Sequence, residues 1–355
     1  MDFFQKDRQT AVEAKEYMQF LAFAPVAFQA ARALLNLGLL AAIEKSRPQG
    51  LTTSEAAEQT GLSLYGARVL LEAGLGIGVL ICQDGRYALT RAGTCLLRDP
   101  MTRVNFDFVN DICYQGLFDL EKSVRTGAPE GLKVFGPWPT IYEALAHLPA
   151  PARESWLKFD HFYSDSAFDA ALPVVFQHQP RRLLDIGGNT GRWALRCVGF
   201  APEVEVCIAD LPGQLTLAQA ETSQHPGGDR ISGFPVNLLE PDSVLPENFD
   251  ALWMSQFLDC FSEDQIRMIL GKCRRVMKPE SRLFILEPFW DRQQFRAAAF
   301  SLQFTSLYFT ALANGNSQMY QSGLFLSLVR ASGFEIQREL DGLGGVHTLL
   351  VCRAV

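Results

Sequence analysis

The segment from Arg182 to Asp210 constrains the fold of this 355-residue chain more than any other. It begins with an apolar run that ends in Asp185-Ile186, continues through the turn Gly187-Gly188-Asn189-Thr190-Gly191, and reaches a second apolar run that ends at Asp210. Glycine lets the backbone turn sharply and approach a ligand closely. A buried strand, a glycine turn, a helix and a second strand with a terminal carboxylate form the first half of a nucleotide-binding α/β unit.

The residues around the turn indicate which nucleoside cofactor binds there. The turn lacks the G-x-G-x-x-G spacing of dinucleotide sites, and Asp185 stands directly before it. A carboxylate is unfavourable beside a pyrophosphate but favourable beside a cationic amino acid, so S-adenosylmethionine (SAM) suits the site. Asp210, about 20 residues after the turn, is placed to bind ribose hydroxyls. A glycine turn that serves only helix packing is the alternative.

Three segments in order carry a resemblance to a known family. They are Asp185 to Gly191, Asp210-Leu211-Pro212, and Phe249 to Leu258. They resemble the successive motifs of small-molecule SAM-dependent O-methyltransferases with an N-terminal winged-helix dimerisation domain, such as plant caffeate and bacterial hydroxyneurosporene methyltransferases. The resemblance covers nearly the whole chain. It implies an α/β fold, with a Rossmann-like class I methyltransferase domain preceded by a mostly α winged-helix domain.

The N-terminal region itself predicts such a winged helix. Residues 13–45 are helical and apolar on several faces, which indicates burial by a partner chain. A capping box at residues 52–55, a second helix over about 64–75 and an Asp84-Gly85 hairpin follow. A DNA-binding helix needs a basic footprint, and residues 51–99 are more acidic than basic. We therefore predict a homodimer through this domain and no nucleic-acid partner.

The pattern along the chain and the resemblance together imply three domains. We expect a dimerisation domain over residues 1–100, a helical connector that covers the active site over 101–178, and the SAM-binding domain over 179–355.

Composition sets further bounds on the chain. The net charge of −7 also disfavours nucleic-acid binding. The uncharged run over residues 17–31 contains Pro25 and is short for a membrane span. The eight cysteines form no C-x-x-C pair, so we predict a reducing, cytoplasmic location and no metal site.

The predicted SAM contacts combine strand positions with the resemblance. Asp210 would hold the ribose hydroxyls, and Asn237-Leu238 stand where the family has the pair that holds adenine. An asparagine can accept a hydrogen bond from the adenine amino group. An Asn237 that only forms a turn is the alternative. The full predicted set is Asp185, Gly187, Gly191, Asp210, Leu211, Asn237, Leu238 and Ser255.

One position departs from the family pattern. The resemblance implies Leu-His-Asp-Trp after the fourth strand, with the histidine as general base, but this chain has Leu258-Asp259-Cys260-Phe261. Ordinary pKa values are about 3.9 for aspartate, 6.5 for histidine and 10 for a phenol, so the change makes proton transfer roughly 3.5 kcal/mol less favourable. Burial that raises the pKa of Asp259 would remove this penalty. Three alternatives stay open: Asp259 is a tuned base, another residue is the base, or Asp259 is structural and the acceptor needs no base.

Two other residues are candidates for catalysis. Glu287 closes the fifth strand where the family has a glutamate that orients the base, and a plain strand-end residue is the alternative. His161 lies in a helix that resembles the family's helix along the methyl donor, so it could supply or share the missing base. The alternative is an ordinary core or surface histidine.

These residues together predict a SAM-dependent methyltransferase for a small hydroxylated acceptor. Aromatic side chains at Phe257, Phe261, Trp290, Tyr308 and Phe309 favour a flat, aromatic acceptor. The resemblance implies O-methylation by default. The alternatives are C-methylation of a phenolic ring, such as an aryl polyene head group, and a protein that binds SAM without transferring a methyl group.

Overall fold

The structure is a computed structural model that describes residues 4–355. The chain forms two compact units, one that ends at Val109 and one that begins at Asn110. The boundary between them lies inside the segment expected to be a helical connector.

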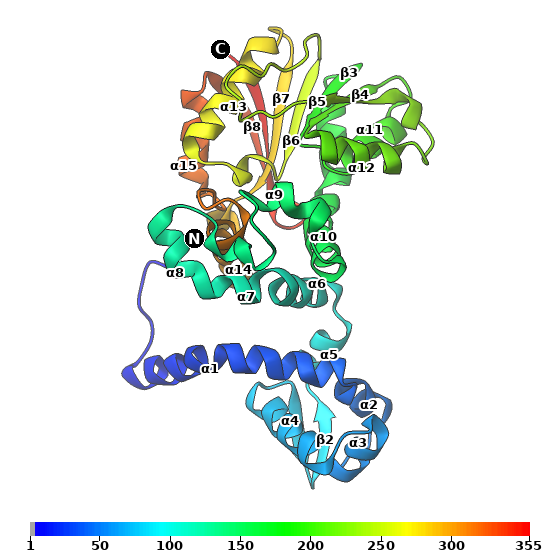
Figure 1. Cartoon of the computed structure of the whole chain (residues 1–355), viewed down its shortest axis with the longest axis vertical. Helices are drawn as coiled ribbons and strands as arrows, with labels where there is room; N and C mark the ends of the chain where they lie inside the picture. Colours follow the sequence, from blue (N-terminus) through cyan, green and yellow to red (C-terminus); the bar gives the residue numbers. More distant parts are fainter. Residues whose placement is uncertain (1–3) are drawn as a thin grey trace. The chain divides into compact units, whose positions relative to one another are not determined.

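The larger unit is built on a seven-stranded sheet with the order β5-β4-β3-β6-β7-β9-β8 (Figure 1). Its strands are β3 (Arg182–Ile186), β4 (Glu205–Asp210), β5 (Ile231–Pro235), β6 (Ala251–Ser255), β7 (Arg282–Pro288), β8 (Phe334–Leu343) and β9 (His347–Ala354). All neighbours are parallel except β9, which is antiparallel to both β7 and β8. The strand order reverses between β3 and β6, so ligands are expected at the carboxyl ends of these two strands. The predicted Rossmann-like fold is confirmed.

Alternating side chains along the central strands enter two separate cores. Leu252, Met254 and Ile285 pack on the face covered by α13 (Glu263–Val276) and α15 (Ser322–Ala331). Trp253 and Phe284 point to the opposite face, which is covered by α10 (Ala150–Phe176), α11 (Arg192–Phe200) and α12 (Pro212–Thr222). A parallel sheet buried on both faces explains why these strands read as continuous apolar runs.

Shorter helical segments complete the larger unit. They are α7 (Tyr114–Gly116), η2 (Leu117–Asp119), α8 (Leu120–Thr126), η3 (Glu130–Val134), α9 (Ile141–Ala144), η4 (Leu145–His147), η5 (Gly228–Arg230), η6 (Leu258–Cys260), η7 (Trp290–Arg292), α14 (Arg296–Tyr308) and η8 (Phe309–Ala313). Two of them matter most for the site. The short η6 follows β6 directly and carries Asp259, and α9 contributes Tyr142.

The smaller unit has the predicted winged-helix elements. All elements of the unit are α1 (Ala11–Asn36), α2 (Leu39–Lys45), α3 (Thr53–Thr60), α4 (Leu64–Gly76), β1 (Leu80–Gln83), β2 (Arg86–Leu89), α5 (Arg91–Arg98) and α6 (Pro100–Phe108), and the π-helix η1 (Val109–Cys113) crosses the boundary to the larger unit. The capping box is present at Thr52 and Glu55. The helix expected over residues 13–45 is two helices, because Gly38 takes a left-handed conformation with φ of 80° and ends the first.

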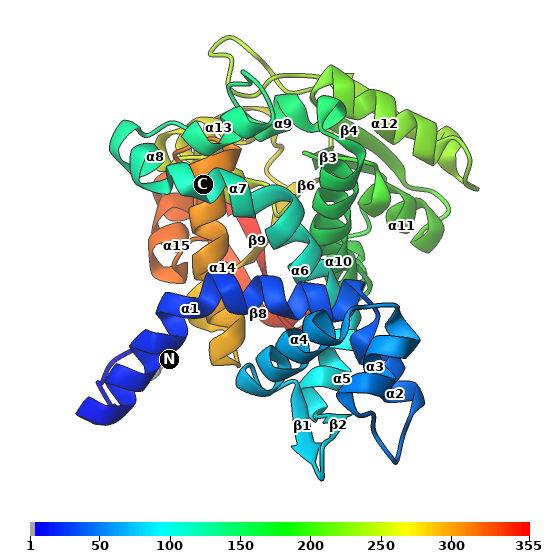
Figure 2. The ribbon, with the colours of Figure 1, turned by 60° about the horizontal axis from the view of Figure 1, so that its bottom comes forward.

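Helix α1 leaves most of its apolar surface uncovered. Its C-terminal half packs on the unit through Ala31 and Leu34, whereas its N-terminal half extends beyond the other helices (Figure 2). The exposed apolar residues of α1 are Val12, Tyr17, Met18, Phe20, Leu21, Phe23 and Val26. By length and composition alone, α1 is the one helix in the described part of the chain that could cross a membrane.

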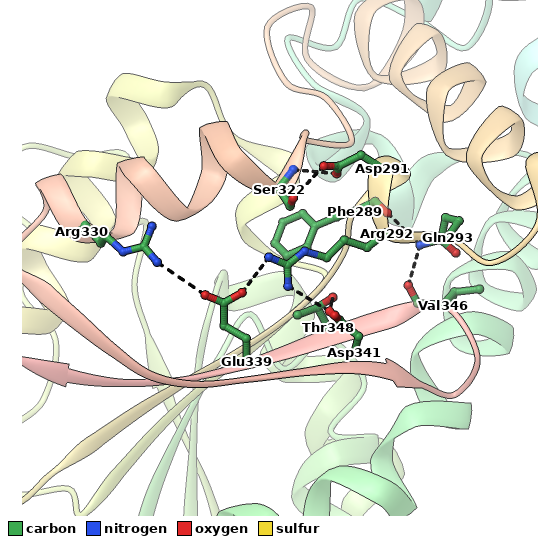
Figure 3. A network of polar contacts seen from close by, with 10 residues as sticks. All are labelled: Phe289, Asp291, Arg292, Gln293, Ser322, Arg330, Glu339, Asp341, Val346 and Thr348. Atoms are coloured by element: carbon green, nitrogen blue, oxygen red, sulfur yellow. Dashed lines mark hydrogen bonds and ion pairs between the residues drawn. The ribbon is translucent and has the colours of Figure 1, made fainter. Parts of the chain in front are cut away.

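An ion-pair network anchors the segment between β7 and α14. Arg292 donates to Asp341 at 2.9 Å and to Glu339 at 2.7 Å, and its guanidinium lies 5.6 Å from the centre of the Phe289 ring (Figure 3). Next to it, the Gln293 side chain donates to the carbonyls of Phe289 and Val346 at 2.8 Å. The segment that leads from β7 into α14 is therefore tied to the β8–β9 hairpin.

Loss of Arg292 is expected to loosen this anchor. Its side chain is 20% exposed, so Arg292→Ala removes a largely buried guanidinium that joins two carboxylates, while Glu339 keeps Arg330 and Asp341 keeps Thr348 as partners. We expect the free energy of unfolding to fall by about 1–2 kcal/mol in a denaturant titration. Arg267→Ala is the matched control, since Arg267 makes only exposed pairs on α13 and should cost below about 0.5 kcal/mol. Equal losses in the two variants would contradict this view.

Candidate active site

The glycine turn lies at the carboxyl end of β3 and packs directly on the segment after β6. Gly187 and Gly191 have φ of 74° and 80°, and Asn189 between them has φ of 50°. A Cβ atom on Gly187 would lie 2.1 Å from the Phe257 ring, so no larger residue fits. Left-handed backbone is natural for glycine and tolerated by asparagine. The turn therefore brings the end of β3 against Phe257, in the segment that leads from β6 to Asp259.

Asp210, at the end of β4, fixes the turn from the other side. One carboxylate oxygen accepts the Asn189 N–H at 3.0 Å and the other accepts the Leu211 N–H at 2.7 Å. Burial raises the pKa of Asp210 to about 6, while these two hydrogen bonds act to lower it. Each oxygen keeps a second lone pair, so the carboxylate can still accept two ribose hydroxyls.

Several buried oxygen atoms near the turn have no hydrogen-bond partner in the described structure. They include Asp185 Oδ2, Asn189 Oδ1 and Ser255 Oγ. Burial, and then the charge of Asp210, raises the pKa of Asp185 well above its usual value. Buried acceptors without donors are costly and unusual in native proteins. A ligand that brings an ammonium group and positive charge would satisfy them.

The other predicted SAM residues lie near β5. The Asn237 carboxamide oxygen accepts the Leu239 N–H at 3.0 Å, which is the turn-forming geometry considered as the alternative. The Leu238 side chain packs in the core, and its carbonyl accepts a hydrogen bond from Lys272 at 3.0 Å. Roles for Asn237 and Leu238 in binding adenine stay predictions.

The residues around the turn fit SAM. Asp185, Asn189, Asp210 and Ser255 supply acceptors, and the glycines supply the space for close approach. When bound, SAM supplies a methyl group on a positively charged sulfur, which makes the departing thioether a good leaving group.

Asp259 occupies η6, beside the turn and at the carboxyl end of β6. It is 3% exposed, and the Cys260 thiol donates to its Oδ1 at 3.4 Å. Burial raises the pKa of Asp259 to about 7, with a smaller contribution from the charge of Asp160, whereas the hydrogen bond from Cys260 lowers it. The pKa of this carboxyl is therefore close to that of an ordinary histidine.

Glu287 lies at the end of β7 and holds the segment that carries Asp259. Its Oε1 accepts the N–H groups of Phe257 and Leu258 at 3.1 and 2.8 Å. Its Oε2 is buried without a hydrogen-bond partner, and burial followed by the charge of Asp259 raises the pKa of Glu287 well above its usual value. Two adjacent buried carboxyls cannot both ionise easily, so they titrate as a pair.

Aromatic hydroxyls and a polar loop surround this pair. The Tyr142 hydroxyl is buried, and after burial its pKa is raised by the charges of Cys260, Tyr308 and Asp259. Asn314 donates to the Cys260 carbonyl at 2.6 Å, and Tyr320 donates to the Phe261 carbonyl at 2.6 Å. The segment that carries Asn314 and Tyr320 therefore contacts the segment around Asp259.

His161 lies on the donor side of the site. Its Nε2 is 3.4 Å from the Thr190 hydroxyl, within the glycine turn. Burial, and then the charge of Arg192, lowers the pKa of His161 to about 4, so the imidazole is neutral at pH 7. A role for His161 as the base stays a prediction, and its observed neighbour is the turn.

Two features of the site were not predicted. Asp160, one residue before His161, accepts a hydrogen bond from Asn189 Nδ2 at 3.1 Å. His347 Nε2 lies 2.6 Å from Gln256 Oε1 and fixes a residue with φ of 46° in the turn before Asp259. For the contact of Asp160, the one sign in the sequence was Asn189, a non-glycine residue inside a glycine turn.

Comparison with known proteins identifies the family. A Dimerisation2-like domain matches residues 15–87, and an O-methyltransferase domain matches residues 164–335. The chain therefore carries a Dimerisation2-like domain and an O-methyltransferase domain, and it is a SAM-dependent methyltransferase. The alternative of a SAM-binding protein without methyl transfer is therefore set aside.

Two relatives from Streptomyces lavendulae match this methyltransferase over most of its length. It is 24% identical to an L-tyrosine C(3)-methyltransferase over 90% of its own chain and 86% of the relative. It is 25% identical to a mitomycin biosynthesis 6-O-methyltransferase, with 85% of each chain covered. A solved O-methyltransferase from neocarzinostatin biosynthesis, in complex with SAM and 2-hydroxy-5-methyl naphthoic acid, has a TM-score of 0.71, with 98% of this chain and 100% of that chain covered at 16% identity. This last likeness shows the fold.

Burial of Asp259 is expected to cost the methyltransferase stability at alkaline pH. A carboxyl whose pKa is raised in the folded state favours folding while protonated, and that advantage is lost as the pH rises from about 4, the ordinary pKa of aspartate, to about 7. Asp259→Asn should therefore raise the free energy of unfolding by about 1–3 kcal/mol at pH 8 and by little at pH 4. Thermal unfolding of the ligand-free protein from pH 4 to 8 measures this. The exposed Asp264→Asn serves as control, and a gain independent of pH would contradict the assignment.

Proposed function

We propose that this methyltransferase deprotonates the hydroxyl of a small aromatic acceptor with Asp259 and directs methyl transfer to the acceptor oxygen. The observation that carries the proposal is the buried Asp259 carboxyl, whose pKa is raised to about 7, at the carboxyl end of β6. A carboxylate with that pKa removes the penalty of roughly 3.5 kcal/mol that an ordinary aspartate would have against a phenol. Relatives named for hydroxylated aromatic substrates support the choice of acceptor.

Each residue of the site has a definite task in this proposal. Asp259 takes the proton from the acceptor hydroxyl, while Glu287 holds the backbone of Phe257 and Leu258 and thereby positions the base. Phe257 and Phe261, whose rings pack edge to face with centres 4.8 Å apart, exclude water and offer apolar surface to the acceptor. Since the methyl donor has a good leaving group, most of the remaining rate enhancement comes from alignment of donor and acceptor.

Removal of the base tests the proposal directly. With SAM labelled in its methyl group and a panel of phenols, Asp259→Asn should lower kcat/KM by about 10²–10⁴-fold while SAM binding is retained. The wild-type kcat/KM should rise with pH to a plateau above about 7, because only the ionised carboxylate accepts a proton. A kcat/KM of Asp259→Asn equal to that of the wild type would exclude Asp259 as the base.

C-methylation beside the phenol hydroxyl is the second candidate. It is favoured by the match to an L-tyrosine C(3)-methyltransferase over 90% of this chain. Deprotonation of a phenol increases electron density on the ortho carbon as well as on oxygen, so the same base serves both reactions. Carbon-13 NMR of the product made with ¹³C-methyl SAM separates a methoxy group from an aryl methyl group. An aryl polyene head group as the acceptor stays a prediction.

The N-terminal unit is proposed to join two copies of the chain. The exposed apolar residues of α1 form a larger uncovered surface than a monomer normally leaves to water. The Dimerisation2-like match over residues 15–87 includes most of this helix. Burial by a second copy would also account for the apolar length of α1 without a membrane, consistent with the proposed cytoplasmic location.

Charge placed on α1 should separate the two copies. Phe20 and Phe23 are 61% and 65% exposed in the single chain, so a double change to Glu costs little within the monomer. We expect light scattering after size exclusion to report a dimer for the wild type and a monomer for Phe20→Glu/Phe23→Glu. Phe118→Glu is the control, since Phe118 is 84% exposed in the other unit and should leave the dimer intact. Wild-type monomers, or detergent-dependent behaviour, would refute the dimer.

A further inference from the structure

Asn189 links the glycine turn to two carboxylates. Its backbone N–H donates to Asp210 at 3.0 Å, and its side-chain Nδ2 donates to Asp160 at 3.1 Å. These two bonds hold the residue in its left-handed conformation with φ of 50°. Its Oδ1 stays buried without a partner in the described structure. Asp160 is thus attached to the donor-binding turn although it comes from α10.

Asp160 also acts on the acceptor side of the site. Its charge is one of the causes that raise the pKa of Asp259, and it contributes in the same way at Tyr308. Burial raises the pKa of Asp160 itself to about 6. Asp160 therefore holds the glycine turn through Asn189, and its charge also acts on the base.

The groups that face these two carboxyls include almost no positive charge. Asp259 is faced by Cys260 on η6, Glu287 on β7, Asp160 on α10, Tyr142 on α9 and Tyr320 before α15, none of which is cationic. Asp160 is faced by Asn189, His161, Asp165, Tyr308 and Arg192. Arg192, the one cation among these described neighbours, is paired with Asp165 at 2.5 Å.

SAM and its product differ by one positive charge at the reacting sulfur. Both carry the ammonium and carboxylate of methionine, but only SAM has the sulfonium, which becomes a neutral thioether in S-adenosylhomocysteine. The methyl group must reach the acceptor oxygen, and the base must be within hydrogen-bond reach of that oxygen. These two contacts bring the sulfonium charge within about 6 Å of the base, where it lowers a carboxyl pKa.

We propose that Asp160 is a positioning residue that couples the glycine turn to Asp259, so that the cationic methyl donor, and not its demethylated product, makes Asp259 release its proton. The released proton goes to solvent, and the carboxylate left behind is the form that accepts the acceptor proton. After methyl transfer the carboxyl keeps the proton taken from the acceptor hydroxyl, and the product, which lacks the sulfonium charge, is bound more weakly. This inference rests on the proposed role of Asp259 as the base.

Proton release on ligand binding tests the coupling without methyl transfer. Isothermal titration calorimetry at pH 6.5 is performed with SAM and with S-adenosylhomocysteine, each in a buffer of low and a buffer of high ionisation enthalpy. A carboxyl with a pKa of about 7 is about three-quarters protonated at this pH. We expect SAM to release about half a proton more than the product does. The excess should vanish at pH 5 and at pH 9, where the carboxyl does not change its protonation.

Variants assign the additional proton release with SAM to particular carboxyls. Asp259→Asn should abolish it, and Asp341→Asn, in the ion-pair network of Figure 3, should leave it unchanged. Asp160→Asn keeps an oxygen that can accept the Asn189 hydrogen bond but removes the charge. We expect this variant to weaken the binding of SAM by about fivefold at pH 8 and the binding of S-adenosylhomocysteine by less than twofold. Asp160→Ala, which also loses the bond to Asn189, should weaken both ligands.

The outcomes separate this inference from the proposed function. Equal proton release by the two ligands in the wild type overturns it, as does an excess that survives in Asp259→Asn. Equal weakening of both ligands by Asp160→Asn shows that Asp160 acts only on the turn and overturns its role in the coupling. If the excess is found but no phenol is methylated, the coupling stands and the assigned acceptor chemistry fails.

Discussion

The burial of several carboxyl groups at one edge of a parallel sheet is the constraint on which the rest of the site depends. Asp185 ends β3, Asp210 ends β4, Asp259 follows β6 and Glu287 ends β7. Parallel strands place their carboxyl ends at the same edge, so residues far apart in the chain meet in one crevice. Burial raises the pKa of all four, which means that the ligand-free fold bears an electrostatic cost there. Such a cost is typical of sites arranged for a ligand rather than for stability.

The parts of this site that are local in sequence could be predicted, and the parts that depend on distant contacts could not. Apolar runs and glycine punctuation were enough to place β3, β4 and the turn between them, because backbone propensity and burial pattern act over a few residues. The pKa of Asp259 depends instead on complete burial and on carboxyls from β7 and α10. From the sequence it was possible to say only that burial would be needed, since neither neighbour is visible in the segment itself.

Asp160 and His161 illustrate the same limit within one helix. The sequence drew attention to His161 because the ordinary pKa of histidine is close to neutral. In the structure the two residues have exchanged their usual properties, since burial lowers the pKa of His161 to about 4 and raises that of Asp160 to about 6. Consecutive residues of an α-helix point about 100° apart, so they enter different surroundings. Residue type is therefore a weaker guide to proton transfer than the groups that each side chain faces.

A buried aspartate and a histidine of similar pKa are not equivalent bases, because their charges differ. Histidine becomes cationic when it accepts a proton and so stabilises the phenolate that it creates, but it also repels a neighbouring sulfonium. Asp259 becomes neutral, and the negative charge passes from the carboxylate to the phenolate without leaving the site. The sulfonium therefore experiences nearly the same field before and after deprotonation, while the phenolate lacks a cationic partner. It follows that a site built on Asp259 works best with acceptors whose hydroxyl is already acidic, since the protein supplies the proton acceptor but not the compensating positive charge.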